Sequence, residues 1–131
     1  MIVSGDAVGR WVCEKIGSDW IAEGAACIGE AKEGKLVSGV FYNHYNGASI
    51  FATIATEKSL SRTFTKAILS YPFDVLKVNC IIVQVSSKNV KSLKLANHLG
   101  FKQIGCIPSA MTDGDMVILS LVKQHCLKFM E

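Results

Sequence analysis

The sequence predicts a single mixed α+β domain, residues 1–131, with a central sheet that is mainly antiparallel. Three consecutive β-rich runs joined by short turns favour an antiparallel meander. A strand, a helix and a strand then follow one another, which requires a crossover and makes the sheet mixed. A chain of 131 residues suffices for one hydrophobic core and is short for two.

The first expected element is a short helix with one apolar side. Asp6 can cap its N-terminus, and apolar residues recur at i, i+3 and i+4 spacing from Val8 to Ile16. Gly17 then supplies a stop. No strand is expected before this helix.

Three antiparallel strands are expected next, over about 25–32, 36–45 and 48–55. The turn signals between them are the segment KEGK at 32–35 and the dipeptide Asn46-Gly47. Asn-Gly between β-rich runs is a strong short-range indicator of a hairpin.

A second helix and a buried strand follow the meander. Ser59 or Ser61 can cap the helix, apolar side chains from Leu60 to Tyr71 share one face, and Pro72 ends it. The run VNCIIVQVS at 78–86 is continuously apolar and β-branched, as in a strand buried on both faces of a sheet.

The last three elements are a helix over about 90–98, stopped by Gly100, and two strands within 101–107 and 116–122. A turn signal at 112–115 separates these strands. The predicted order is therefore α-β-β-β-α-β-α-β-β.

Composition narrows the class of protein. The net charge of +3, with dispersed lysines, suits an anionic small molecule better than nucleic acid. No apolar run approaches the ~18 residues of a membrane span, and the first residues do not resemble a signal peptide. Five cysteines without a CxxC motif indicate reduced thiols in a cytoplasmic protein. The three histidines lie far apart in the sequence, so no metal site is expected.

Residues 88–105 resemble part of the GNAT superfamily of N-acetyltransferases. Many members have an Asn after a strand, then a helix, then a Gly-Phe pair, and Asn89 and Gly100-Phe101 keep that spacing. A closer resemblance is to small bacteriophage and prophage members. It rests on the segments GVFYNHYNGASIFATIA at 39–55, YPF at 71–73 and DGD at 113–115. The resemblance implies a GNAT-like fold with splayed middle strands, in the cytoplasm of a bacterium or of a phage-infected host.

The resemblance also implies an acyl-CoA-dependent N-acyltransferase. Such an enzyme transfers acetyl from acetyl-CoA to an amine of a protein or small molecule, by direct attack in a ternary complex. The alternative is a non-catalytic GNAT-like module that binds and inhibits a host protein partner.

The expected CoA site lies at the N-terminus of the second helix, because free backbone N–H groups there bind anions. Charged and hydroxyl side chains can add to that site, and a backbone N–H of the preceding strand can polarise the thioester carbonyl. Asn89 can contact the pantetheine arm or simply cap its helix. The expected cofactor-binding residues are Ile54, Ala55, Lys58, Ser59, Ser61, Arg62 and Asn89.

Candidate catalytic residues follow from the same resemblance. Glu57, at the end of the third meander strand, can serve as general base if its pKa is raised, and His44 and Tyr45 are other options. The family's usual acid is a Tyr at the position of Ala96. Ser92, one turn earlier in the helix, or water would then protonate the departing thiolate.

The sequence departs from the family pattern in two further places. The expected pyrophosphate loop, TEKSLSR at 56–62, has no glycine. The strand that usually precedes the first helix is also expected to be absent. Its absence would expose a sheet edge and allow self-association as a homodimer.

Overall fold

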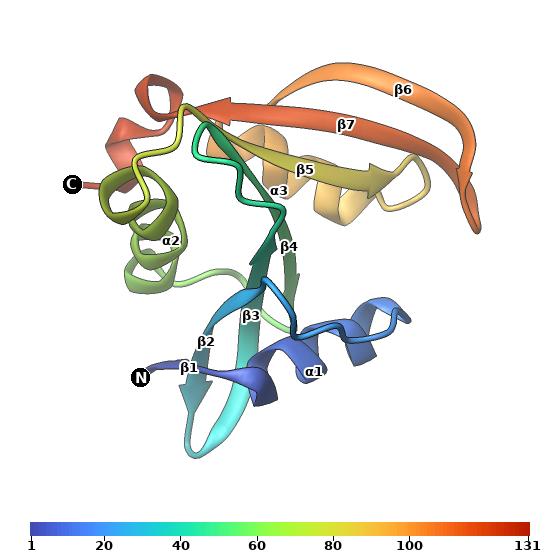
Figure 1. Ribbon diagram of the computed structural model, residues 1–131. Coiled ribbons are helices and arrows are strands. Elements are labelled where there is room, and N and C mark those ends of the chain that lie inside the picture. The colour runs from blue at the N-terminus through green and yellow to red at the C-terminus, as the bar shows by residue number, and fades with distance from the viewer.

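The computed structural model describes residues 1–131 and confirms the mixed α+β class. Seven strands form one sheet in the order β1-β2-β3-β4-β5-β7-β6 (Figure 1), and every neighbouring pair is antiparallel except β4 and β5. No helix is long and apolar enough to span a membrane. The elements are β1 (Ile2–Ser4), α1 (Asp6–Ile16), β2 (Ala26–Lys32), β3 (Lys35–Asn43), β4 (Ser49–Thr56), α2 (Arg62–Ser70), a π-helical turn (Tyr71–Val75), β5 (Cys80–Ser86), α3 (Val90–Leu99), β6 (Lys102–Met111), β7 (Gly114–Val122) and 3₁₀ turns at Lys123–His125 and Leu127–Phe129.

The three meander strands are confirmed as β2, β3 and β4, with each end within two residues of its expected position. The Asn46-Gly47 turn forms as predicted. The Asn46 side-chain oxygen accepts hydrogen bonds from the backbone N–H groups of Ala48 and Ser49, at 2.9 and 2.8 Å. Gly47 has a φ of 89°, a conformation that favours glycine.

The expected absence of a strand before α1 is wrong. Strand β1 pairs antiparallel with β2, with Val3 opposite Gly29, and the Met1 ammonium donates to the Ala31 carbonyl at 3.0 Å. A strand of three residues carries too short an alternation to be recognised from the sequence. Because β1 pairs with residues 28–30 of β2, the sheet ends on this side in the short strand β1 and not in β2. The long edge strand is instead β6, whose side chains are largely exposed.

Helix α1 begins differently from the prediction but ends as predicted. Gly5 occupies the N-cap position without a side-chain hydrogen bond, and Asp6 lies in the first turn, where its charge favours the helix dipole. Gly17 ends the helix in the left-handed conformation. The helix packs closely on the sheet because Gly39 leaves room for Val12, whose side chain lies 2.7 Å from where a Cβ would stand.

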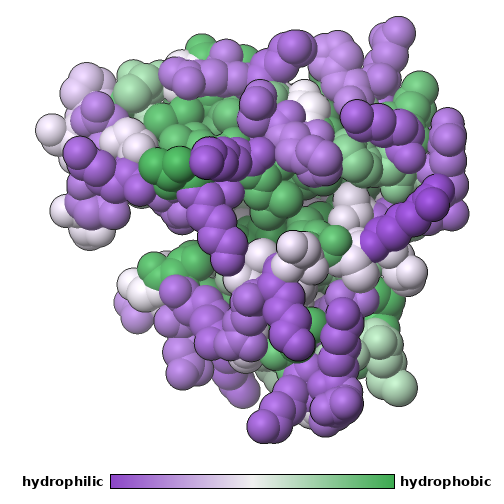
Figure 2. All heavy atoms as spheres, turned by 180° about the vertical axis from the view of Figure 1, so that it is seen from behind, coloured by the Kyte–Doolittle hydropathy of each residue, from purple (hydrophilic) through white to green (hydrophobic).

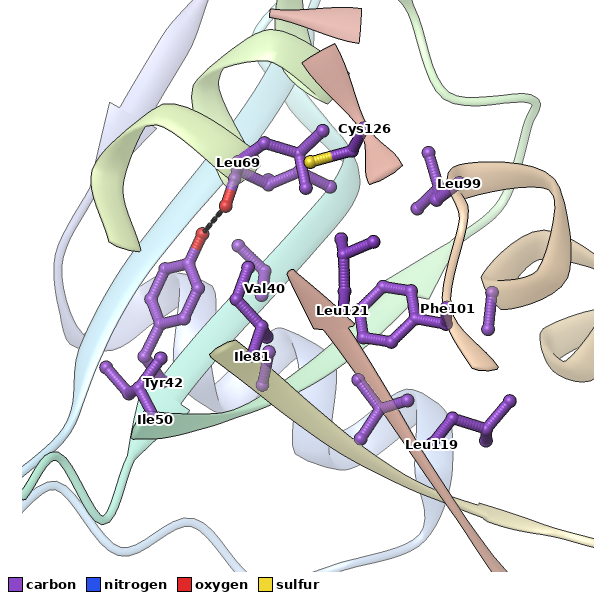
Figure 3. Close-up of a cluster of buried hydrophobic side chains, with 14 of the residues drawn as sticks. Val40, Tyr42, Ile50, Leu69, Ile81, Leu99, Phe101, Leu119, Leu121 and Cys126 are labelled. Atoms are coloured by element: carbon purple, nitrogen blue, oxygen red, sulfur yellow. Dashed lines mark hydrogen bonds between the residues drawn. The ribbon is translucent and has the colours of Figure 1, made fainter. Parts of the chain in front are cut away.

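Strand β3 is buried on both of its faces. Its Val40 and Tyr42 side chains join the main hydrophobic core with α2 and α3, whereas Phe41 packs with α1 in a smaller cluster. The main core is shown in Figure 3. The alternation of side chains along a strand therefore lets β3 connect both layers.

Tyr42 compensates for Pro72 at the end of α2. In a regular helix, the carbonyl of Ile68 accepts from the N–H of residue 72, which a proline lacks. The Tyr42 hydroxyl donates to the Ile68 carbonyl instead, at 2.6 Å (Figure 3). Helical geometry then continues as the π-helical turn, rather than stopping at Pro72 as expected.

We predict that Tyr42→Phe lowers the free energy of unfolding by about 1–3 kcal/mol, because it removes a donor from a buried carbonyl. Urea denaturation measures the change. Tyr45→Phe is the matched control, since the Tyr45 hydroxyl makes an exposed bond of 3.3 Å to the Leu76 carbonyl. Equal losses in the two variants would contradict this role for Tyr42.

Gly100 is required at the end of α3 for two reasons. Its φ of 107° is unfavourable for other residues, and a Cβ would lie 2.5 Å from the backbone oxygen of His125. We therefore expect Gly100→Ala to lower the free energy of unfolding by more than about 1 kcal/mol. Gly105→Ala is the control, because no atom lies within 4 Å of where its Cβ would stand. The prediction fails if both variants unfold at the wild-type urea concentration.

Strands β4 and β5 separate soon after they begin. Their parallel pairing extends only from Ser49–Cys80 to Phe51–Ile82. Beyond that point β4 continues to Thr56 and β5 to Ser86 without pairing to each other. The predicted splay of the middle strands is confirmed, and it divides the sheet into β1–β4 and β5–β7 (Figure 1).

Candidate functional site

A cleft of about 1040 Å³ opens where β4 and β5 diverge. Its walls come from the end of β4, the following loop, the start of α2, one face of α3, the end of α1 and the C-terminal 3₁₀ turn. Figure 2 shows the molecule from behind, with a hollow that has hydrophobic residues inside and hydrophilic side chains around its edges. Both an apolar arm and a charged group can therefore be accommodated.

The structure brings eight of the nine predicted site residues to this cleft, namely Ile54, Ala55, Glu57, Lys58, Ser59, Arg62, Asn89 and Ser92. Ser61 is the exception. It is the N-cap of α2, where its hydroxyl accepts from the Phe64 N–H at 3.0 Å and donates to the Glu30 carboxylate at 2.7 Å. The capping alternative for Ser61 is therefore the observed one.

The cleft is strongly cationic. Glu57 is the only carboxylate among its lining residues, and it pairs with Lys15. The other basic residues make no ion pair within the chain. This excess of positive charge favours an anionic ligand. The basic lining residues are Lys15, Lys58, Arg62, Lys91, Lys94 and Lys128.

The strand register distinguishes the two predicted main-chain contacts. The Glu57 N–H donates to the Val37 carbonyl at 2.9 Å, so Ala55, two residues earlier, also directs its backbone groups toward β3. Ile54 directs its N–H and C=O to the opposite side, which is open because β5 has diverged. Ile54 is therefore the residue whose main chain faces the cleft.

Glu57 is held by a cation from α1. The Lys15 ammonium lies 2.5 Å from Glu57 Oε2, and both side chains are partly exposed. This hydrogen bond and the charge of Lys15 lower the pKa of Glu57 below its ordinary value. The raised pKa expected of a general base is therefore not found, and Glu57 is a weaker base than a free glutamate.

We expect Lys15→Met to raise the pKa of Glu57, measured by NMR titration of its side-chain carboxyl. The pair stabilises the fold at neutral pH, and this contribution is lost as the pH falls through the lowered pKa of the folded state. Lys123→Met is the control, because Lys123 pairs at 2.9 Å with Asp74, outside the cleft. An unchanged pKa in Lys15→Met would show that the pair does not form in solution.

Helix α3 presents Asn89 and Ser92 at the cleft. The Asn89 side-chain oxygen caps the helix by accepting from the Ser92 N–H at 3.2 Å, which leaves its amide NH₂ group for a ligand. Ser92 is half-buried, and its hydroxyl makes no hydrogen bond within the chain. Ala96 is buried in the main core and does not line the cleft.

The two alternative bases lie elsewhere. His44 packs edge-on against Phe51 with ring centroids 5.6 Å apart, and the Tyr45 hydroxyl bonds to the Leu76 carbonyl. Neither lines the cleft. These two expectations are not supported by the geometry, because the end of β3 lies at the opposite end of β4 from Glu57.

The sequence analysis missed several cleft residues. Lys91, Lys94 and His98 lie on the cleft side of α3, and their spacing on a helix could have revealed a shared face. Lys128 and Phe129 come from the C-terminal turn, and the Phe129 ring lies 5.3 Å from that of His98. No local sequence signal marks these two, because only the tertiary fold brings the turn to α3.

Comparisons with known proteins show where this fold occurs. A mutant of the spermidine N-acetyltransferase SpeG from Vibrio cholerae superposes with a TM-score of 0.80 at 15% identity, covering 100% of this chain and 99% of that chain. The Vibrio cholerae enzyme in complex with CoA and spermine superposes with a TM-score of 0.76 at 15% identity, covering 97% of each chain. A dodecameric form has a TM-score of 0.79 at 16% identity, covering 100% and 98%. No family model and no curated protein matches the chain.

These similarities establish a GNAT-like fold for this chain, as expected from the order of its elements. The spermidine N-acetyltransferases are neighbours in structure at low identity. Their likeness therefore concerns the backbone arrangement.

Proposed function

We propose that this protein is an acyl-CoA-dependent N-acyltransferase that transfers acetyl from acetyl-CoA to an amine. The observation that carries the proposal is the cationic cleft at the divergence of β4 and β5. Its apolar interior suits a pantetheine arm, and its basic rim suits the phosphates of CoA. The structural neighbour in complex with CoA and spermine supports the same assignment.

Different residues of the cleft would bind different parts of CoA. Lys58, Ser59 and Arg62 would hold the pyrophosphate beside the N-terminus of α2. The backbone of Ile54 would form a hydrogen bond with the pantetheine arm or the thioester. Ala55, whose backbone groups bond to β3, would line the cleft beside Ile54. The free amide group of Asn89 would donate to the arm from the opposite wall.

In the proposed reaction, acetyl-CoA supplies the acyl group, and the neutral amine attacks its carbonyl carbon directly. The new C–N bond forms, the C–S bond breaks, and CoA leaves as its thiolate. The Ile54 N–H would stabilise negative charge on the carbonyl oxygen. Glu57 would accept the amine proton, directly or through water, at Oε1, the oxygen that Lys15 does not hold. The thiolate would take its proton from water, either directly or through the Ser92 hydroxyl, which would receive a proton from water as it gives up its own.

The proposed acceptor is an amine of a protein or of a small molecule. Spermine, found with the structural neighbour, is a polycation, and this cleft contains one carboxylate, already paired with Lys15. Charge therefore does not favour a polyamine here. The reaction would take place in the cytoplasm of a bacterium or of a phage-infected host, where acetyl-CoA is available.

A second candidate is a GNAT-like module that binds and inhibits a protein partner without catalysis. It is favoured by one observation, the burial of Ala96 in the core where an acid would be expected. Transfer of radiolabelled acetyl to a panel of amines separates the candidates. Binding of acetyl-CoA without transfer to any amine would favour the module.

We predict that wild-type protein binds CoA in calorimetry, and that Lys58→Ala combined with Arg62→Ala weakens binding by roughly tenfold or more. The reason is the loss of charge-assisted bonds to phosphate. Lys32→Ala combined with Lys35→Ala is the control, since it removes the same charge from the β2–β3 hairpin, outside the cleft. Equal weakening in both double variants would indicate only a general effect of charge.

For catalysis, we expect Glu57→Gln and Ser92→Ala each to lower kcat by about 100-fold with little change in the affinity for CoA, because general acid–base assistance has about this magnitude. Steady-state kinetics and calorimetry measure the two quantities. A wild-type kcat in either variant removes that residue from the mechanism.

A further inference from the structure

Two polar side chains are buried beneath the loop that joins β4 to α2. Ser38 on β3 is 1% exposed and Glu30 on β2 is 6% exposed. Burial of polar groups is unfavourable unless they form hydrogen bonds. Both side chains bond to this loop, one at each end of it.

At the start of the loop, three groups form a directed chain of hydrogen bonds. The Thr56 hydroxyl donates to the Lys58 carbonyl. The Ser38 and Thr56 hydroxyl oxygens lie 2.7 Å apart and share a hydrogen bond, in which Ser38 is the donor when Thr56 donates to Lys58. The Lys58 N–H also lies 3.3 Å from the Thr56 oxygen. Thr56 therefore holds both backbone groups of Lys58.

At the other end of the loop, Ser61 is held from both sides. Its hydroxyl donates to Glu30 and accepts from the Phe64 N–H. Its carbonyl accepts from the Thr65 hydroxyl at 2.8 Å and from the Thr65 N–H at 2.9 Å. The N-terminus of α2 is thereby attached to β2.

The loop between these two ends has no glycine and no residue with positive φ. Its shape therefore does not come from the backbone freedom of a glycine-rich loop. Two hydrogen bonds to the sheet flank this segment, at Thr56 before Lys58 and at Ser61 before Arg62, and both cations line the cleft.

We propose that Glu30, Ser38 and Thr56 are positioning residues, which replace glycine in fixing this loop for the recognition of a pyrophosphate. This inference rests on the proposed function, since it takes CoA as the ligand. Glu30 and Ser38 do not line the cleft, whereas Thr56 does, so Ser38→Ala separates the positioning role of Thr56 from a direct contact of its hydroxyl with the ligand. Each acts through the backbone of Lys58 or through the N-cap of α2.

The experiment compares the affinity for CoA with the affinity for pantetheine, which has the same arm without a pyrophosphate. Thr56→Val removes the hydroxyl at nearly constant volume, and Thr56→Ser keeps it. We expect Thr56→Val to weaken CoA binding roughly tenfold, with pantetheine changed less than about twofold, and Thr56→Ser to retain wild-type affinity for CoA. Competition calorimetry measures both ligands, and thermal unfolding checks that each variant is folded.

Three further variants keep the test decisive if Thr56→Val does not fold. Ser38→Ala removes only the donor to Thr56, and we expect the same selective loss for CoA, severalfold in size. Glu30→Gln keeps an acceptor for Ser61, so we expect CoA affinity to be retained, whereas Glu30→Leu loses it.

The outcomes separate this inference from the proposed function. If wild-type protein binds neither CoA nor acetyl-CoA, the proposed function fails. If wild-type protein binds CoA, and the folded variants either bind it unchanged or lose CoA and pantetheine equally, the positioning role is wrong.

Discussion

The arrangement of this protein depends on the limited pairing between two parallel strands. Strands β4 and β5 share only three residue pairs before they diverge. From that point each strand keeps its outer partner, β3 or β7, and loses its inner one. The inner edge of β4 then exposes backbone groups that elsewhere in a sheet would be bonded. The cleft, which is lined on one side by the backbone of β4, is therefore a direct consequence of the strand arrangement.

The elements around this cleft give it an excess of positive charge. The β4–α2 loop, the first residue of α2, α3 and the C-terminal turn all contribute lysine or arginine, while the single carboxylate is paired with Lys15. Hydrogen bonds from β2 and β3 to the loop position two of these cations, Lys58 and Arg62, although the loop contains no glycine. Backbone geometry and side-chain charge therefore both favour an anionic ligand that has an extended apolar part.

Much of the fold was predictable because its signals are local. The Asn46-Gly47 turn, the cap at Asn89 and the left-handed Gly100 each act within a few residues. The predicted site residues on the β4–α2 loop came from the family resemblance together with the position of a helix N-terminus, and the cleft also contains residues of α1, α3 and the C-terminal turn. Strand β1 escaped prediction because three residues are too few for a pattern, and Pro72 did not stop the helical path because Tyr42 supplies a distant donor.

Local patterns in the chain were enough to establish the meander and the order of the later elements, and the family resemblance added part of the anion site. Which residues meet depends on the folded arrangement. The Ser61 hydroxyl bonds to Glu30 and does not face the cleft. Lys15 of α1 forms an ion pair with Glu57, and Phe129 of the C-terminal turn packs against His98 of α3. Periodicity and capping depend on neighbours in the chain, whereas these contacts join residues that are distant in sequence and meet only when the sheet forms.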